Sequence, residues 1–556
     1  MSTSSVILPD ESCVLPAPHA SRATGTKPVT FNNPFGVKYL ERRSIIPATL
    51  TTAQKESTDT PNTENIQGDI YYMFPKKFEH FVFFIVRDVQ QFWQALGRYA
   101  SRITSSATTA ERIKNISEDS SVAYTSNQIA FSKAGLMFLN IKDDLGDFHF
   151  DNGSMRKKKY ELGDRGDWNK IFDDATTHGV FVVAAKTDTD CEAEENDIRR
   201  IFAASIASFT SMAGRVRPGD GEHFGWRDGI SQPGIEDLIL KPQPGQRIVK
   251  PGVIIMGYPG DPIKDDPSSI QRPTFCKDGS FMVFRKLEQD VLGFNDYIDR
   301  NWKAVPAKVG NTSLTDKQRK DLFGARMVGR FKTGAPLALT PYRDSSEYTD
   351  PDRINNFDYT EGVVADKPDR PPNCPFAAHI RKTAPRSLDP FVQKDYLDAS
   401  MIVRAGIPYG PEVSDEEKNG WKRGDLQSVE RGLLFVCYQS SIKNGFYRQT
   451  TKFAANDFFP ATNIEPAVHG PDPIIGGPPK APQVSDPVDI DEGSVVIKMV
   501  DNKNTRYVVT GVAKKVDTSA TGYQQEWWIT SRGGEYFFVP SISAIKNWCE
   551  NPPTSS

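Results

Sequence analysis

Cysteine is scarce in this chain. Six cysteines are spread over 556 residues, and no two of them form a CxxC pair. Neither a disulfide framework nor a structural zinc site is expected from such spacing. Free thiols in an intracellular protein are the simplest account of these residues.

Long apolar runs and a large excess of one charge are also missing. The longest apolar stretch, residues 81–86, has the length of a strand and falls far short of the roughly 18 residues that a membrane span needs. The formal net charge of −3 gives no reason to expect nucleic acid or an acidic membrane surface as a partner. Residues 1–18 show no basic segment followed by an apolar one, so a secretory signal is not expected. An intracellular monomer or homodimer fits these features.

An irregular arm precedes a regular succession of strands and helices. Residues 1–62 are rich in Ser, Thr, Pro and Ala and lack periodicity. Beyond them, apolar runs such as 78–86 and 432–438 alternate with segments of helical periodicity, which favours an α+β or α/β sheet. The pattern indicates one unit at 63–240 and a second at 241–556. Individual expectations include a helix running from Cys191 through Phe209, and strands at 494–500 and 507–512.

One loop stands out for its composition. The segment Gly221-Glu-His-Phe-Gly-Trp-Arg-Asp-Gly-Ile-Ser-Gln-Pro233 mixes glycines, a carboxylate, a proline and aromatic residues, and no regular helix or strand favours that mixture. Gly225 and Gly229 bracket Asp228, so the backbone can turn tightly there. A carboxylate held on such a loop between apolar neighbours is a candidate acid or base. Composition alone favours the alternative, an Asp-Gly turn with a solvated Asp228.

The sequence Gly225-Trp-Arg-Asp-Gly229 resembles the GxxDG signature of the dye-decolorising peroxidases, haem enzymes in which that aspartate lies over the iron. Further blocks follow in the family's order, from about Gly68 to Asn547, and they include Ile129-Ala-Phe-Ser, Ala325-Arg-Met-Val-Gly-Arg330, His379-Ile-Arg381 with Pro385-Arg386, and Gly432-Leu-Leu-Phe-Val-Cys-Tyr-Gln439. Arg404-Ala-Gly-Ile-Pro-Tyr-Gly and Asp472-Pro-Ile-Ile-Gly476 resemble the fungal-type branch. The resemblance implies two ferredoxin-like α+β halves, each an antiparallel sheet with helices. It also implies haem b, held mainly by the C-terminal half.

On one side of the haem, the resemblance implies that His379 is the iron ligand. Without it, a lone histidine in such a segment is more often structural. His223 is the nearest rival, but a histidine five residues from Asp228 would face the wrong side. Ligand histidines usually donate their second ring N–H to a carboxylate, and Asp472 is the candidate acceptor, with Asp457 second. The resemblance also suggests that Arg381, two residues past the ligand, pairs with a haem propionate.

On the other side, the resemblance implies that Asp228 acts as base and then acid on hydrogen peroxide. A carboxylate has a reference pKa near 4, so an acidic activity optimum is expected. Arg404 matches the distal arginine, whose fixed charge stabilises the anionic peroxide; a surface arginine is the alternative. Leu433 and Phe435 alternate on a strand and should line the distal pocket together with Ile230 of the loop, although packing within the core explains the strand pair equally well.

Electron transfer to large donors needs oxidisable side chains near the surface. Tyr409 occupies the position of a tyrosine used in this way by some fungal members. The companion tryptophan expected in the segment after Gln449 is replaced by Phe453, which is too hard to oxidise. Efficient oxidation of large dyes is therefore in doubt, whereas small phenols and dyes should react.

The resulting hypothesis is a haem peroxidase that uses hydrogen peroxide and small organic reductants. The alternative is a haem-binding or iron-release protein without significant peroxidase turnover, for which the histidine alone would suffice. A hydrolase is a third interpretation, but the chain contains no nucleophile elbow.

Overall fold

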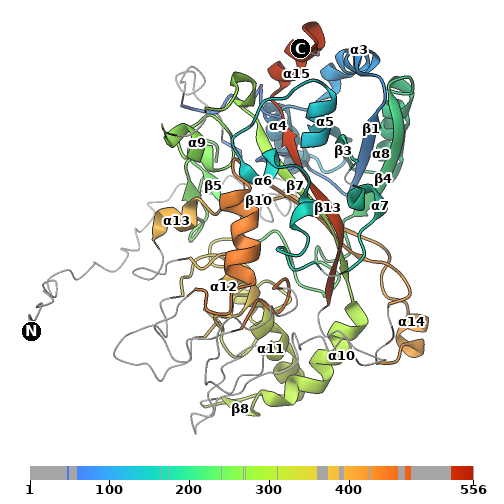
Figure 1. Ribbon diagram of the computed structural model, residues 1–556. Helices are drawn as coiled ribbons and strands as arrows, with labels where there is room; N and C mark the ends of the chain where they lie inside the picture. Colours follow the sequence, from blue (N-terminus) through green and yellow to red (C-terminus); the bar gives the residue numbers. More distant parts are fainter. Residues whose placement is uncertain are drawn as a thin grey trace, which may run out of the picture.

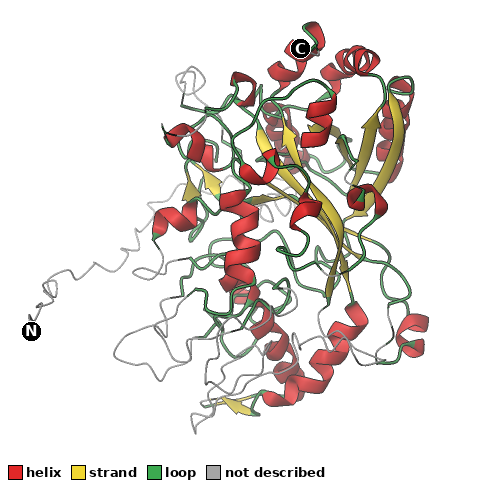
Figure 2. Cartoon of the chain, in the orientation of Figure 1, coloured by secondary structure: helices red, strands yellow, loops and turns green. Residues whose placement is uncertain are grey.

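The computed structural model describes residues 45, 47–48, 59–164, 166–174, 176–239, 241–266, 268, 271–309, 311–359, 373–386, 393–423, 425, 427–460, 470–476 and 528–554. Most of the arm at 1–62 and the strands expected at 494–500 and 507–512 lie outside these residues. Sheet strands occupy one part of the molecule in Figure 2, and helices and loops surround them.

The first half of the sheet has the ferredoxin-like arrangement. Its four strands lie in the order β2-β3-β1-β4, all antiparallel. Two helices follow β1 and one follows β3, which gives the βαββαβ succession of that fold. The elements are β1 (Phe78–Val86), α3 (Val89–Tyr99), α4 (Ser106–Glu118), β2 (Thr125–Phe131), β3 (Gly179–Ala185), α8 (Asp188–Ile201) and β4 (Ile206–Arg215).

Helix α3 shows why these residues form these elements. Asp88 caps its N-terminus by accepting a hydrogen bond from the backbone N–H of Gln91. Its buried side chains, which include Phe92, Trp93 and Leu96, recur at helical spacing and pack against the sheet. By contrast, the helix expected to run through Phe209 is wrong in its extent. Helix α8 ends at Ile201, and the residues from Ile206 onward form β4 instead.

The second half repeats the arrangement with a different set of strands. Their order is β10-β12-β7-β13, with β11 also paired to β12, and every pairing is antiparallel. The strands are β7 (Ser280–Gln289), β10 (Val403–Arg404), β11 (Ile407–Tyr409), β12 (Gly432–Gln439) and β13 (Ile529–Val539). The main helices are α10 (Val291–Asn301), α11 (Asp316–Val328), α12 (His379–Thr383), the π-helices η7 (Lys443–Tyr447) and η8 (Gln449–Ala454), and α15 (Ile542–Glu550).

Shorter helices and two-stranded pairs lie around the main sheet (Figure 1). The short helices are α5 (Lys133–Phe138), α6 (Phe148–Asp151), η2 (Met155–Lys158), α7 (Lys170–Asp173), α9 (Pro262–Asp265), α13 (Lys394–Asp398) and α14 (Asp415–Gly420). Three- and four-residue 3₁₀ turns account for the rest: η1 (Ala100–Arg102), η3 (Pro251–Val253), η4 (Thr274–Cys276), η5 (Trp302–Ala304) and η6 (Ser346–Thr349). Two-stranded pairs are formed by β5 (Gly234–Ile235) with β6 (Ile248–Val249) and by β8 (Lys308–Val309) with β9 (Thr312–Ser313).

The two halves close into one barrel. Strand β13 of the second half pairs with β2 of the first through Phe538 and Phe131. Three strands separate β1 from β7 along the sheet, yet the ring of Phe284 on β7 lies 5.0 Å from Phe81 and 4.9 Å from Phe83 on β1. Such contacts require the sheet to curl so that these side chains meet inside. The expectation of two antiparallel, ferredoxin-like halves is confirmed, while the boundary at residues 240 and 241 stays a prediction.

The structure adds two facts to the expectations from composition. None of the helices in the described ranges is long and apolar enough to cross a membrane. The five cysteines in the described part of the chain are free thiols, four of them buried.

An ion-pair cluster joins α8 to β1 at the outer face of the sheet. His80 lies between two carboxylates: Nδ1 is 2.9 Å from Oε2 of Glu195, and Nε2 is 3.0 Å from Oδ1 of Asp188. Burial lowers the pKa of His80, but the hydrogen bonds and charges of the two carboxylates outweigh this effect, so the net pKa is raised. Protonated His80 therefore stabilises the contact between helix and strand.

We expect His80→Gln to lower the free energy of unfolding by about 1–2 kcal/mol near pH 5.5, and by much less near pH 8.5. Because the folded pKa of His80 is raised, its contribution is complete below the unfolded pKa and is lost as the pH rises through the folded pKa. Urea unfolding at the two pH values measures the difference. An equal deficit at both would show that the charge on His80 contributes nothing.

Candidate active site

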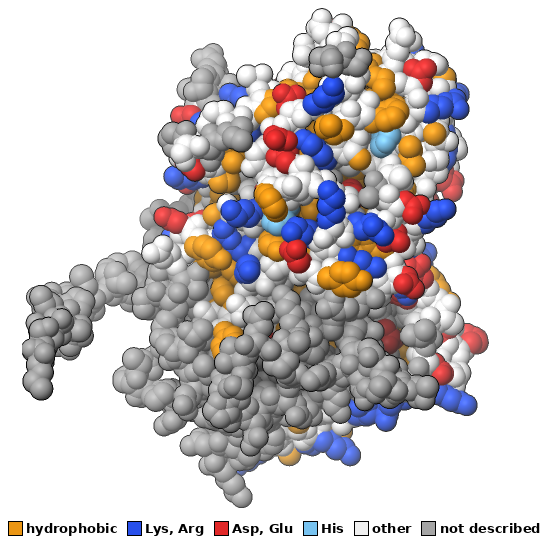
Figure 3. Space-filling model, viewed as in Figure 1, with side chains coloured by type: hydrophobic (Ala, Val, Ile, Leu, Met, Phe, Trp, Pro, Cys, Tyr) orange, Lys and Arg blue, Asp and Glu red, His pale blue; other side chains and the backbone are white. Residues whose placement is uncertain are grey.

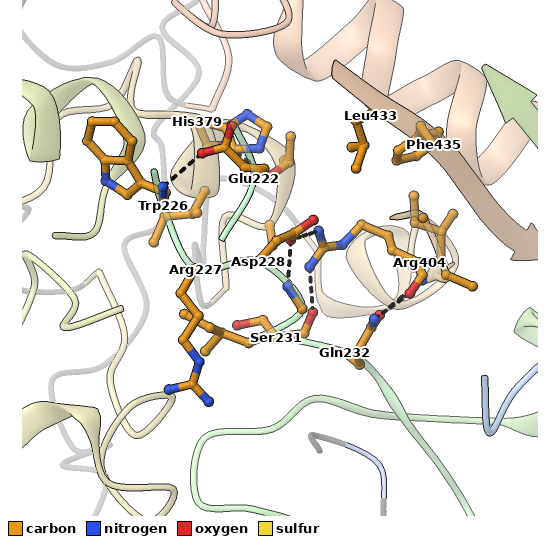
Figure 4. A pocket seen from close by; sticks show the side chains of 18 of the residues that line it. Glu222, Trp226, Arg227, Asp228, Ser231, Gln232, His379, Arg404, Leu433 and Phe435 are labelled. Carbon is orange, nitrogen blue, oxygen red and sulfur yellow. Dashed lines mark hydrogen bonds and ion pairs between the residues drawn. The ribbon is translucent and has the colours of Figure 1, made fainter. Parts of the chain in front are cut away.

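A large cavity lies against the outer face of the second half of the sheet. Its volume is about 1670 Å³, and loops and strands from both halves line it. Pockets for drug-sized ligands measure roughly 300–1,000 Å³, so this cavity has room for a larger molecule. Figure 4 shows Asp228, Arg404 and His379 around this space, with Leu433 and Phe435 on the neighbouring strand.

The loop Gly221–Pro233 reaches the cavity because a partly buried carboxylate, that of Glu222, shapes it. Glu222 accepts hydrogen bonds from the backbone N–H groups of Phe224 at 2.8 Å and Trp226 at 2.9 Å, and from Nε2 of Gln289 at 2.5 Å. The indole N–H of Trp226 donates to the carbonyl of Arg330 at 2.8 Å. These bonds fix the turn that presents the following residues to the cavity.

Asp228 follows this turn and forms an ion pair with Arg404 of β10. Nη1 of Arg404 lies 2.6 Å from Oδ1 of Asp228, and its Nη2 donates to the carbonyl of Ser231 at 3.1 Å. Gly229 has φ of +73°, a left-handed conformation that favours glycine next to the carboxylate. Both members of the pair line the cavity. The structure thus brings together two residues that are 176 positions apart in the sequence.

The ion pair sets the protonation of the carboxyl. The Asp228 side chain is 42% exposed and opens to the cavity; desolvation by the surrounding protein raises its pKa, but the charge and the hydrogen bond of Arg404 outweigh this, so the net pKa lies below its ordinary value. Asp228 is therefore an ionised carboxylate that can accept a proton. Its partner Arg404 is held in place by Gln232, whose side chain accepts a hydrogen bond from the backbone N–H of Arg404 and donates one to its backbone carbonyl.

His379 begins α12, and its side chain reaches the same cavity. Its Nδ1 lies 2.7 Å from Oδ2 of the fully buried Asp472. The backbone N–H groups of Ile474 and Ile475 donate to the other oxygen of that carboxylate, at 2.8 and 3.2 Å. A carboxylate fixed in this way accepts a hydrogen bond from Nδ1–H and leaves Nε2 of His379 as the nitrogen that can bind a ligand.

A single imidazole cannot hold a bare metal ion. Among the described residues, no group of three or more His, Cys, Asp and Glu side chains could do so either. A cofactor that brings most of its own metal ligands fits this arrangement better, and the size of the cavity suits such a group.

The two alternative candidates, His223 for the iron ligand and Asp457 for its carboxylate partner, lie outside the cavity. His223 is buried, and its Nε2 is 2.8 Å from the carbonyl oxygen of Tyr409. Burial, followed by the charge of Arg217, lowers the pKa of His223 to about 4. Neither His223 nor Asp457 lines the cavity.

Arg381, which the sequence predicted to pair with a haem propionate, does not line the cavity. Its guanidinium is buried, donates to the carbonyl of Cys374 at 2.5 Å, and lies 3.9 Å from the ring centre of Phe376. Arg386, five residues later, does line the cavity and stacks 3.8 Å from the ring centre of Phe357. An arginine of this segment does face the cavity, but the direction of the chain after α12 decides which one.

The apolar residues named from sequence line the cavity as a group. On β12, Leu433 and Phe435 are half-buried and face it, while their neighbours Leu434 and Val436 are buried in the core. Ile230 also lines it, next to the ion-paired Asp228. The two-residue period of the strand explains this division.

The residues named for electron transfer are more enclosed than expected. Tyr409 is only 7% exposed, and its hydroxyl lies 3.4 Å from Oε1 of Glu430. Phe453 is buried and stacks on Phe459, with ring centres 4.1 Å apart. Neither side chain lines the cavity.

Sequence reasoning missed Glu222, Arg330 and Arg386 as parts of the site. Arg330 is buried, donates to the carbonyl of Ile354 and the side chain of Asn355 at 2.8 Å each, and lines the cavity. Arg330 and Arg386 stood within blocks that were noted for their family likeness, but nothing in the sequence distinguished them from Arg381. No signal marked Glu222.

Comparisons with known proteins support the barrel fold. A family model described as the DyP dimeric alpha+beta barrel domain matches residues 65–218. The chain is 35% identical to dye-decolorizing peroxidase AauDyP1 of Auricularia auricula-judae, over 94% of this chain and 95% of that protein. It is 36% identical to a dye-decolorizing peroxidase of Exidia glandulosa, over 94% of each.

Solved structures give the same result. An ancestral D-type dye-decolorizing peroxidase is 38% identical with a TM-score of 0.75, over 88% of this chain and 99% of the other. A dye-decolorizing peroxidase in complex with 2,6-dimethoxyphenol is 36% identical with a TM-score of 0.72 over the same shares.

We expect Glu222→Gln to destabilise the fold by about 2 kcal/mol, because an amide would turn one N–H toward the donors that the carboxylate now accepts. Amide hydrogen exchange in residues 222–229 should become faster than in α3. The matched control is Glu236→Gln, which changes an exposed carboxylate nearby. Unchanged exchange in the loop would mean that other contacts hold its shape.

Proposed function

Because the chain belongs to the dye-decolorising peroxidase family, we propose that Asp228 and Arg404 act on hydrogen peroxide, and that His379 holds the iron of haem b. Oxidation of organic donors is the activity that the relatives' names support. The observation that carries the residue roles is that the ion pair of Asp228 with Arg404 and the imidazole of His379, held from behind by the buried Asp472, line one cavity.

The residues present fit a haem. Nε2 of His379 remains for the iron, since Asp472 engages Nδ1. Arg386 lines the cavity as a cation able to face a propionate, in the role first expected of Arg381. When bound, the haem takes two oxidising equivalents from peroxide and passes them on to donors.

Asp472 acts as a positioning residue. Its charge and hydrogen bond favour an Nδ1–H tautomer, which fixes the orientation of the imidazole and makes Nε2 a stronger donor of electron density. The two backbone N–H groups that bind its other oxygen keep the carboxylate from rotating away.

Asp228 moves the proton. Its ionised carboxylate accepts a proton from one oxygen of hydrogen peroxide and delivers it to the other oxygen, which departs as water. Arg404 supplies a fixed positive charge beside the separating charges, and it is already aligned by Ser231 and Gln232. The same ion pair keeps the pKa of Asp228 low, so the base remains active in acidic solution.

Small phenols are the donors that suit the interior. Leu433, Phe435 and Ile230 give the cavity an apolar wall, against which an aromatic ring can lie. A haem carrier would need His379 alone, whereas the Asp228–Arg404 pair has no evident use in binding. That pair favours the peroxidase over the haem-binding or iron-release alternative.

We expect Asp228→Asn to lower kcat/KM for hydrogen peroxide by about 10²–10⁴-fold, because the amide cannot accept the proton. Haem binding, followed through the Soret band, should remain. Asp237→Asn, an isosteric change at an exposed position, is the matched control. Loss of haem together with activity would leave the role of Asp228 unsupported.

The pH dependence follows from the same group. Since the folded pKa of Asp228 lies below its usual value near 4, kcat/KM for peroxide should stay high on acidification and fall only below about pH 4. Activity that is negligible near pH 4 and highest at neutral pH would contradict Asp228 as the base.

We expect His379→Ala to weaken haem binding and to shift the Soret band, since Nε2 is lost. Added imidazole should restore the spectrum, because the cavity left by the side chain can admit it. Titration of the haem-free variant with haem measures both effects. An unchanged spectrum would place the iron ligand elsewhere.

A further inference from the structure

A surface of mixed basic and aromatic side chains lies outside the cavity, where α6, η2 and η7 meet. We call it the basic aromatic surface and define it by Phe148, Lys157, Tyr160, Lys443 and Tyr447. Phe148 is 60% exposed and Tyr160 is 73% exposed, whereas a soluble protein usually buries such rings. Figure 3 shows Lys and Arg side chains gathered among apolar ones on this face.

Tyr447 is held in this surface by contacts with two neighbouring side chains, His149 and Glu161. Its ring stacks on His149 with centres 3.9 Å apart and planes 28° apart. Its hydroxyl donates to Oε2 of Glu161 at 2.6 Å. Lys158 fixes Glu161 through a 2.9 Å ion pair and also lies 5.7 Å from the ring centre of Phe148. Two aromatic rings, a carboxylate and a cation thus form one connected group.

The same tyrosine stands next to the wall of the cavity. Phe446, the preceding residue of η7, lines the cavity, and its ring lies 6.3 Å from that of Phe435. Gln449 and Thr450, which follow in η8, line the cavity as well. One helix therefore carries the cavity wall and the half-exposed Tyr447.

The protonation of these groups suits transfer of a proton. Burial, and then the hydrogen bond and charge of Glu161, raise the pKa of Tyr447 to about 12, so the phenol is neutral. Hydrogen bonds from Lys158 and Tyr447 lower the pKa of Glu161, so the acceptor is ionised. Burial lowers the pKa of His149 and keeps the stacked imidazole uncharged. Tyr409, by contrast, is 7% exposed, and its carboxylate contact is 3.4 Å long.

Resting on the proposed peroxidase function, we infer that Tyr447 is a surface oxidation site for anionic aromatic donors too bulky to enter the cavity. The donor's rings lie on Phe148 and Tyr160, and its sulfonate or carboxylate groups face Lys157 and Lys443. Both lysines are exposed, and Lys157 donates from Nζ to the carbonyl oxygen of Asn152 at 2.6 Å, a neutral partner that leaves its charge uncompensated.

The electrons and protons balance in this scheme. Tyr447 gives one electron to the peroxide-oxidised cofactor and its phenolic proton to Glu161, which produces a neutral phenoxyl radical. The docked donor then gives one electron, and Glu161 returns the proton to re-form the phenol. Two such cycles, with two protons from solvent, reduce one hydrogen peroxide to two waters and release two oxidised donors.

The test compares two donors in the haem-loaded enzyme. Tyr447→Phe keeps the ring and removes the hydroxyl, so kcat/KM for a sulfonated anthraquinone dye should fall at least tenfold. Oxidation of 2,6-dimethoxyphenol, which can enter the cavity, should change less than twofold. Tyr396→Phe is the matched control, since that tyrosine is 39% exposed beside the same helix and does not line the cavity.

A second readout does not depend on turnover. After addition of peroxide and a nitroso spin trap, peptide mass spectrometry should find the adduct on Tyr447 in the wild type and lose it in Tyr447→Phe. If both donors fail with the wild type, the proposed peroxidase function is wrong. If the dye is oxidised equally by Tyr447→Phe and no adduct forms on Tyr447, the surface site is wrong and the peroxidase stands.

Docking can be measured separately. Binding of the sulfonated dye to the cyanide-inhibited holoenzyme should weaken at least threefold in the double variant Lys157→Gln, Lys443→Gln, and the difference should shrink with added salt. Lys546→Gln on α15 is the charge control. Equal affinity in the wild type and the double variant would overturn the assignment of these lysines.

Discussion

The ion pair between Asp228 and Arg404 is the contact on which the site depends. Asp228 lies on a loop that follows the first half of the sheet, and Arg404 lies on β10 of the second half, so the pair ties the two halves together at the cavity. Its geometry is fixed from both sides, by the turn around Glu222 and by Gln232 on the backbone of Arg404. The pair also holds the pKa of Asp228 low. One interaction therefore both ties the two halves together and keeps the Asp228 carboxyl ionised.

The barrel explains how such a site is kept rigid. Its interior is filled by aromatic side chains from strands that are distant along the sheet, with Phe284 touching both Phe81 and Phe83. The outer face of β12 is then free to present Leu433 and Phe435 to the cavity. A strand alternates its side chains between the two environments, and so one element serves both core and site.

The cavity and the basic aromatic surface share the helix formed by η7 and η8. Its inner face carries Phe446, Gln449 and Thr450, and its outer face carries Tyr447 with Glu161 and His149. The absence of a relay tryptophan at Phe453 therefore does not by itself exclude oxidation at the surface. A phenol with an adjacent carboxylate provides a different route, because electron loss and proton loss are coupled.

From the sequence alone, the family likeness identified four residues that the structure brings together: Asp228, Arg404 and His379 line the cavity, and Asp472 binds His379. The rhythm of strands and helices predicted an α+β or α/β sheet, and the family likeness alone predicted its two antiparallel halves. Only the tertiary structure decided that Arg386 rather than Arg381 faces the cavity, and that α8 stops at Ile201. The hydrogen bond between Tyr447 and Glu161 could not be predicted from the sequence either, because the two residues are 286 positions apart. Side-chain direction and long-range contact depend on how the chain returns through space, which local sequence does not encode.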